Sequence, residues 1–114
     1  MSSSKYRNIL EQENIIKELA KEKSFYRISI LKKAEPKLII AICEIIYNIL
    51  EGNLRLDDSQ KALLFKEKKY LRKLVEKNKI TFKRRLLIQK GGFILPLLLP
   101  IALSAISSFL STDG

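Results

Sequence analysis

The sequence contains no histidine and no tryptophan, and it has a single cysteine, Cys43, among its 114 residues. One cysteine cannot form a disulfide within the chain, and a structural zinc site would lack its usual ligands. The sequence also has no glycine-rich phosphate loop and no serine or cysteine beside an evident base. We therefore expect a protein that is not an enzyme, with no catalytic residues, no metal and no cofactor. Cys43 stands in the apolar run LIIAICEIIYNIL, which predicts a small buried side chain.

A secretory signal is not visible either. The first 23 residues are polar and charged, without an apolar segment, and the start MSSS lacks the glycine that myristoylation requires. These features predict a protein that stays in the cytosol or nucleus.

Acidic residues are scarce between residues 61 and 90, which contain twelve Lys and Arg but only two Glu. In residues 1–60 the numbers of basic and acidic residues are nearly equal. This one segment therefore carries the whole net charge of +10. Localised charge of this kind indicates an anionic partner, either nucleic acid or an anionic membrane, although a solvated lysine-rich helix face remains an alternative. Nothing resembles a base-reading motif, so we expect contacts to phosphates. The predicted nucleic-acid contacts are Lys66, Lys68, Lys69, Arg72, Lys73, Lys77, Lys79, Lys83, Arg84, Arg85 and Lys90. We expect the aromatic residues of the segment, Tyr70 and Phe82, to lie in the core.

Apolar spacing predicts an all-α fold, a small helical bundle around a buried central helix followed by a C-terminal hydrophobic helix. The central helix runs from Pro36 to Glu51 and is apolar nearly all round, so other helices must surround it. Pro36 suits the first position of a helix, and Gly52 suits a left-handed terminator. Before it, we expect a helix over 5–23 and another over 24–34. The second has Ser24 as its N-cap and apolar residues every three positions at Phe25, Ile28 and Leu31.

After the central helix, Asp57 and Gln60 have the spacing of a capping box and predict a helix over 58–76. Thr81 then caps a short helix that ends at Gly91. The expected organisation is a disordered N-terminus at 1–4, a helical core at 5–60, a basic helical DNA-binding segment at 61–90, and a Gly-Gly hinge with a hydrophobic tail at 91–114.

The tail contains a run without charge from Phe93 to Leu110, which as one helix would be roughly 27 Å long, at the short edge of what spans a bilayer. Pro96 and Pro100 each remove a backbone donor, so a kinked or interfacial helix is an equal alternative. The residues predicted to contact a membrane or to pack are Phe93, Leu95, Pro96, Leu98, Pro100, Ile101, Ile106 and Phe109.

The stretch KRRLLIQKGGFILPLLLPIALSAI resembles the C-terminal region of the adenovirus mu core protein precursor, also called pX. Similar small basic proteins occur in the Polinton and adintovirus elements of animal genomes. The matching features are Arg84 and Arg85, the pair Gly91–Gly92, and the later Pro96 and Pro100. In that family the basic part condenses viral DNA in the capsid, and a viral protease cuts after Gly-Gly. The resemblance therefore implies a processing site at Gly91, Gly92 and Phe93, with the cut before Phe93. A helix stop and hinge is the alternative interpretation of the two glycines.

The leading expectation is thus a sequence-independent, DNA-condensing virion core protein of an adenovirus-like virus or mobile element, located in the virion core or the host nucleus. Its partners would be DNA and, through the tail, capsid proteins, the viral protease or a membrane. Two alternatives remain open: a membrane-active or tail-anchored protein on a cytosolic membrane face, and a homo-oligomeric scaffold.

Overall fold

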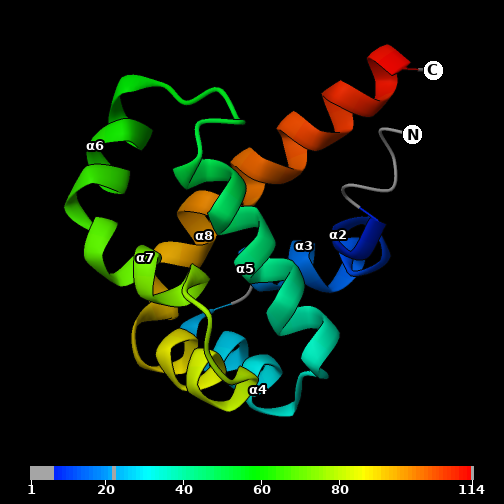
Figure 1. Ribbon diagram of the computed structural model, residues 1–114. Helices are drawn as coiled ribbons and strands as arrows, with labels where there is room; N and C mark the ends of the chain where they lie inside the picture. Colours follow the sequence, from blue (N-terminus) through cyan, green and yellow to red (C-terminus); the bar gives the residue numbers. More distant parts are fainter. Residues whose placement is uncertain (1–6, 22, 114) are drawn as a thin grey trace.

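In the computed structural model, every regular element within residues 7–21 and 23–113, whose backbone the structure describes, is an α-helix (Figure 1). Side chains are described over the same ranges except at 24, 91–94, 101, 102 and 105–113. The helices are α2 (Arg7–Glu11), α3 (Glu13–Lys21), α4 (Ser24–Lys33), α5 (Pro36–Leu50), α6 (Asp58–Lys66), α7 (Lys68–Val75) and α8 (Ile80–Asp113). The predicted all-α class is confirmed. The radius of gyration, 13.3 Å, matches the value of about 13 Å for a folded chain of this length. The expected disordered segment 1–4 lies outside the described residues.

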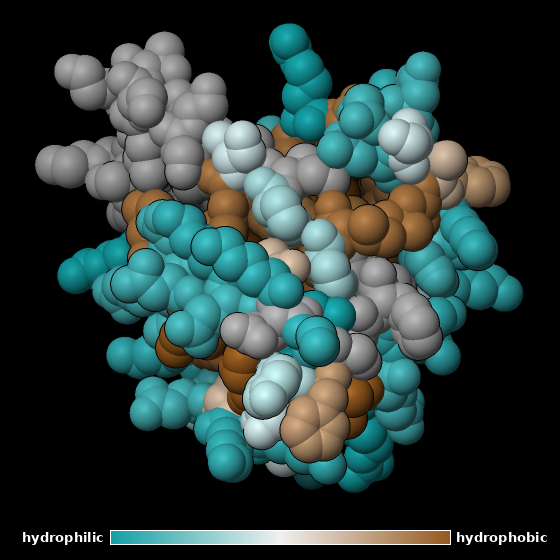
Figure 2. Space-filling view, turned by 180° about the vertical axis from the view of Figure 1, so that it is seen from behind, coloured by the Kyte–Doolittle hydropathy of each residue, from teal (hydrophilic) through white to brown (hydrophobic). Residues whose placement is uncertain are grey.

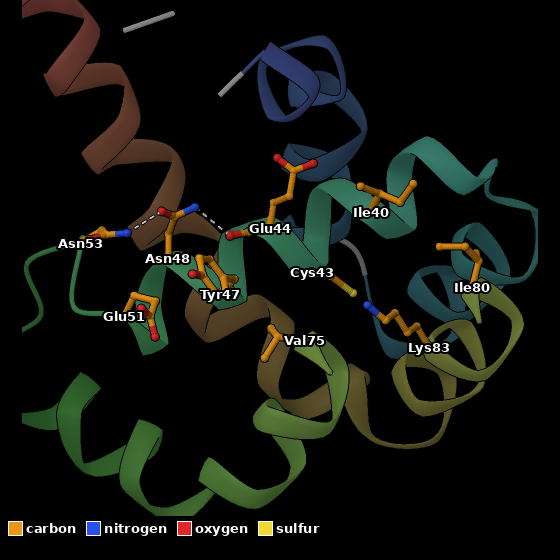
Figure 3. A pocket seen from close by; sticks show the side chains of 10 residues that line it. All are labelled: Ile40, Cys43, Glu44, Tyr47, Asn48, Glu51, Asn53, Val75, Ile80 and Lys83. Carbon is orange, nitrogen blue, oxygen red and sulfur yellow. Dashed lines mark hydrogen bonds between the residues drawn. The ribbon is translucent and has the colours of Figure 1, made fainter. Parts of the chain in front are cut away.

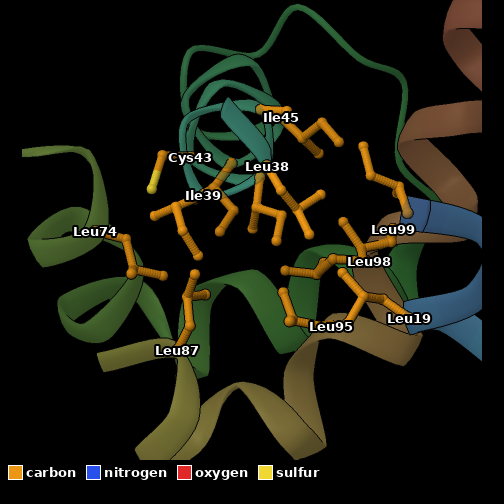
Figure 4. Close-up of a cluster of buried hydrophobic side chains, with 14 of the residues drawn as sticks. Leu19, Leu38, Ile39, Cys43, Ile45, Leu74, Leu87, Leu95, Leu98 and Leu99 are labelled. Carbon is orange, nitrogen blue, oxygen red and sulfur yellow. The ribbon is translucent and has the colours of Figure 1, made fainter. Parts of the chain in front are cut away.

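Helix α5 lies at the centre of the core, as its apolar sequence predicts. Pro36 is in its first turn, where the missing N–H breaks no hydrogen bond. Helices α2, α7 and α8 pack around it. Figure 4 shows side chains of α5 meeting Leu74 of α7, Leu19 of α3 and several leucines of α8. The buried residues of α5 are Leu38, Ile39, Ala41, Ile42, Cys43, Ile45, Ile46, Asn48 and Ile49.

The C-terminal end of α5 is a Schellman turn formed by Gly52. The N–H of Gly52 donates to the carbonyl of Ile49 at 3.2 Å, and the N–H of Asn53 donates to the carbonyl of Asn48 at 3.0 Å. Gly52 has a φ of +77°, in the left-handed region that other residues disfavour. The predicted left-handed terminator is confirmed.

We expect the Gly52→Ala substitution to lower the free energy of unfolding by about 1 kcal/mol, because a Cβ atom strains left-handed backbone. Apart from its neighbours in the chain, no atom of the described residues lies within 4 Å of the added Cβ, so a clash would not contribute. Gly52→Asn is the matched control and should cost less, since asparagine tolerates this conformation. Urea denaturation of the three chains measures the difference, and an alanine variant as stable as the unchanged chain would contradict the turn.

The capping box before α6 is confirmed, but the single helix expected over 58–76 is wrong. The carboxylate of Asp57 accepts from the N–H of Gln60 at 2.8 Å, and the Gln60 side chain accepts from the N–H of Asp57 at 2.7 Å. The helix breaks at Glu67, which separates α6 from α7. The break changes the direction of the chain (Figure 1), and α7 rather than α6 then packs against α5. Helix α6 has no buried residue in the structure, whereas α7 buries Leu71 and Leu74.

The N-terminal helices also differ from the prediction in detail. The helix expected over 5–23 is divided at Gln12 into α2 and α3. The N-cap position of α4 is Lys23, not Ser24, and its side chain forms no capping hydrogen bond. Helix α4 turns Leu31 and Arg27 inward, and the guanidinium of Arg27 donates to the carbonyl of Leu19 at 3.0 Å. Phe25 faces outward instead, because the buried side of α4 lies against α8 and α3.

Helix α8 contradicts the expected hinge. The short helix capped by Thr81 and ended by Gly91 is wrong, since α8 begins at Ile80 and continues through Gly91 and Gly92 to Asp113. Glycine within a helix costs about 1 kcal/mol relative to alanine. Buried leucines on both sides of the pair offset this cost by holding the helix on the core (Figure 4). Pro96 and Pro100 lie inside the helix, and Figure 1 shows that α8 changes direction along its length.

The beginning of the predicted tail is part of the core. Leu95, Leu98, Leu99 and Leu103 are buried in the same cluster as the side chains of α5, while Pro96 is half-buried and Pro100 is exposed. The side chains of Phe93, Ile101, Ile106 and Phe109, which we also assigned to the tail, lie outside the described ones. No helix within the part of the chain that the structure describes is long and apolar enough to cross a membrane.

Candidate nucleic-acid interface

The outer face of α7 is cationic along its whole length. Leu71 and Leu74 are turned into the core, so the helical period places Lys68, Lys69, Arg72 and Lys73 on the opposite, exposed side. Among the described residues, none of these four cations forms an ion pair with a carboxylate. Their charges are therefore directed to solvent and available to an anionic partner.

Further exposed cations flank α7 in the sequence on both sides. Lys66 ends α6, Lys77 and Lys79 lie in the connection between α7 and α8, and Arg85 lies in the second turn of α8. We refer to eight of the ten exposed cations of residues 61–90 as the cationic surface: Lys66, Lys68, Lys69, Arg72, Lys73, Lys77, Lys79 and Arg85. Figure 2 shows one face of the molecule, on which hydrophilic residues cover most of the surface and hydrophobic ones form smaller areas between them.

Two hydrogen bonds hold the first turns of α8 between α4 and α7. The guanidinium of Arg84 donates to the carbonyl of Leu31 in α4 at 2.7 Å. The hydroxyl of Tyr70 in α7 donates to the carbonyl of Leu86 at 2.8 Å. Arg85 stands between Arg84 and Leu86 in the chain, so both neighbours are anchored while its own side chain is exposed.

Three of the predicted nucleic-acid contacts are engaged with, or half-buried in, the fold itself. Arg84 is half-buried and bonded to α4, as described above. The ammonium of Lys90 lies 3.0 Å from a carboxylate oxygen of Glu67 and 5.6 Å from the centre of the Tyr70 ring. The Lys83 side chain is half-buried and points toward the sulfur of Cys43 (Figure 3). Arg84 and Lys90 therefore have partners within the fold and Lys83 is half-buried, whereas the other eight predicted cations are exposed and form no ion pair among the described residues.

Lys83 and Cys43 line a groove of about 510 Å³ between α5 and the start of α8, together with Tyr47 and Val75 (Figure 3). Cys43 is buried, as predicted. Burial raises the pKa of its thiol to about 11, and the nearby Lys83 ammonium only partly opposes this effect. The sulfur is therefore a neutral thiol at neutral pH, and a neutral thiol is a poor nucleophile. The described residues contain no group of acidic or cysteine side chains that could hold a metal ion.

The aromatic residues of the basic segment divide into two kinds. Tyr70 and Phe82 are half-buried, and burial raises the pKa of the Tyr70 hydroxyl well above its usual range. Phe65, which the sequence reasoning left out of the site, is 80% exposed at the end of α6. Its sequence signal is its place within the lysine-rich stretch KALLFKEKKY, four residues after Lys61 and four before Lys69.

The predicted processing site at Gly91, Gly92 and Phe93 lies within α8, with helical backbone at all three positions. A protease that binds its substrate in extended form would require local unwinding of this helix.

Comparisons of the chain with protein-family models, with curated proteins and with solved structures found no match.

Proposed function

We propose that this chain is a non-enzymatic protein that binds duplex DNA without reading its sequence. The observation that carries the proposal is the outer face of α7, where four cations stay exposed with no carboxylate partner among the described residues. Lys68 and Arg72, and likewise Lys69 and Lys73, are like charges four residues apart, an arrangement that weakens a helix by about 0.2–0.5 kcal/mol per pair. Folding does not favour such a face, whereas a row of phosphates would relieve its repulsion.

The rest of the cationic surface supports the same proposal. Lys77, Lys79 and Arg85 follow α7 in the sequence and are exposed, and the two hydrogen bonds to Leu31 and Leu86 fix the turn of α8 that carries Arg85. Side chains of this kind neutralise phosphates and release counterions. The resulting binding is tight, independent of the DNA sequence and weakened by salt. Base-specific recognition would need side chains inserted into a groove, and lysines on an exposed helix face do not supply it.

An anionic membrane is the alternative partner for such a surface, and the structure favours it less. Membrane-surface proteins insert one continuous apolar face. The large exposed apolar side chains come instead from five different helices: Ile15, Phe25, Tyr26, Ile40, Tyr47, Phe65 and Leu97. The buried leucines of α8 between 95 and 103 are already packed on the core.

The resemblance of 83–110 to the mu core protein precursor suggests the setting for this binding. On that basis the chain would condense DNA in the virion core of an adenovirus-like virus or mobile element. The burial of Leu95, Leu98, Leu99 and Leu103 leads us to leave proteolytic release of the tail out of the proposal.

The test is duplex binding by the full chain, followed by fluorescence anisotropy with two unrelated duplexes of equal length. With about six phosphate contacts, we expect the affinity for both duplexes to fall about a thousandfold between about 50 and 200 mM salt. Vesicles of phosphatidylserine and phosphatidylcholine serve as the lipid control. Failure to bind either duplex at the lowest salt, or binding to vesicles that survives high salt, would overturn the proposal.

A further inference from the structure

Phe65 is the most exposed of the large hydrophobic side chains described in the structure, at 80%. It lies on α6, which buries no side chain and packs mainly against α7. Truncation of a side chain this exposed would remove little packing, so the fold itself gives no reason for a phenyl ring at this position.

The surroundings of the ring are strongly cationic. Lys61 precedes Phe65 by one helical turn, and Lys66, Lys68 and Lys69 follow it, all of them exposed. The only acidic residue among them, Glu67, is turned away from solvent, with 11% of its side chain exposed, and pairs with Lys90 of α8 at 3.0 Å. The ion pair neutralises the one negative charge at this junction, and Phe65 lies two residues before the helix break at Glu67, where α6 meets α7 in the chain.

We infer that Phe65 is a base-stacking residue and that the junction of α6 and α7 binds unpaired bases of single-stranded nucleic acid. The inference rests on the proposed function, because the same lysines would hold the phosphates. An aromatic ring stacks on a nucleobase of any sequence, and lysines around it track the backbone, which is how sequence-tolerant single-strand binding is achieved. In an intact duplex the faces of the bases are covered by their neighbours, so the ring adds nothing to duplex binding. The junction therefore binds single strands more tightly than lysines alone would allow.

The inference predicts that the Phe65→Ala substitution weakens binding to an oligothymidylate of about 20 nucleotides by about tenfold to a hundredfold. Binding to a matched duplex, and to an abasic oligonucleotide of the same length, should change less than about twofold. The abasic strand keeps the phosphates and lacks the bases, so the comparison isolates stacking from charge. Circular dichroism confirms that the variant is folded.

A direct optical readout comes from Phe65→Trp, because the chain has no other tryptophan. Oligothymidylate should quench the fluorescence of this tryptophan, and the abasic strand should not. Phe25→Trp is the matched control, since Phe25 is 77% exposed and lies on a different helix, α4. Equal quenching at both positions would overturn the assignment, because exposure alone would then explain it.

The remaining outcomes distinguish the stacking role from the proposed function and from membrane binding. If the duplex binds with the expected salt dependence but Phe65→Ala leaves oligothymidylate binding unchanged, the stacking role is wrong and the proposed function stands. If neither duplex nor single strand binds, both fail together. If phosphatidylserine vesicles shift the tryptophan emission of the Phe65→Trp variant and oligothymidylate does not quench it, the ring contacts membranes and the inference is overturned.

Discussion

A chain that ends at Gly92 is expected to lose its cooperative unfolding transition. The truncation removes Leu95, Leu98, Leu99 and Leu103, which are buried in the core beside α5. Loss of one buried leucine side chain costs about 2–5 kcal/mol, and a domain of this size has about 5–15 kcal/mol in total. Removal of four, at about 8–20 kcal/mol together, is therefore comparable to or larger than the whole stability of the fold. Far-UV circular dichroism during urea denaturation measures the loss, as a shallow transition in place of a sigmoidal one.

A matched pair of substitutions separates packing from chain length. Leu98 is fully buried, whereas its neighbour Leu97 is 54% exposed. We expect Leu98→Ala to lower the free energy of unfolding by about 2–5 kcal/mol and Leu97→Ala by less than about 1 kcal/mol. A truncated chain that unfolds as cooperatively as the full chain would contradict this account, and it would restore the tail release that the resemblance to the mu precursor implies.

Local signals in the sequence were sufficient for the ends of the central helix. Pro36 and Gly52 delimit α5 as predicted, and the Asp57 and Gln60 side chains form the predicted capping box. Each of these features depends on residues within one or two turns of each other, so the nearby sequence is sufficient to predict it.

Errors arose where distant contacts override local preference. The break at Glu67 is accompanied by an ion pair with Lys90, which is far away in the sequence. The helix continues through Gly91 and Gly92 because leucines before and after them pack on the core, although glycine pairs usually end a helix. A prediction made from short stretches of sequence does not include either of these distant contacts.

In the candidate site too, some features follow from local sequence and others depend on distant contacts. The count of charged residues located the cationic segment, but it did not show which of its cations form contacts within the fold. Arg84 bonds to a carbonyl 53 residues away, and Lys83 meets a cysteine of another helix. Phe65 was missed for the opposite reason: an aromatic residue in a lysine-rich helix is usually buried, and only the three-dimensional structure shows that this one is not.

Replacement of the four cations of α7 by glutamine, K68Q/K69Q/R72Q/K73Q, should weaken duplex binding by about a hundredfold to a thousandfold at about 0.1 M salt. The slope of log affinity against log salt should become shallower by about 3–4, since each phosphate contact contributes about 0.9. The substitutions also remove like-charge pairs from the helix, so the free energy of unfolding should stay the same or rise slightly. A loss of binding therefore cannot be attributed to unfolding, and urea denaturation verifies this.

The control variant removes the same number of charges elsewhere, at four exposed cations of α3, α5 and the connection before α6: Lys17, Lys21, Lys37 and Arg55. If net charge alone drives binding, both variants weaken it equally, because each lowers the charge from +10 to +6. If phosphates contact the outer face of α7, only the first variant changes the salt slope by about 3–4, and the control changes it by less than about 1. The salt slope is the decisive quantity because it reports the number of phosphate contacts, whereas the affinity also depends on the long-range electrostatic field of the whole molecule. Equal slopes in the two variants would remove α7 from the interface.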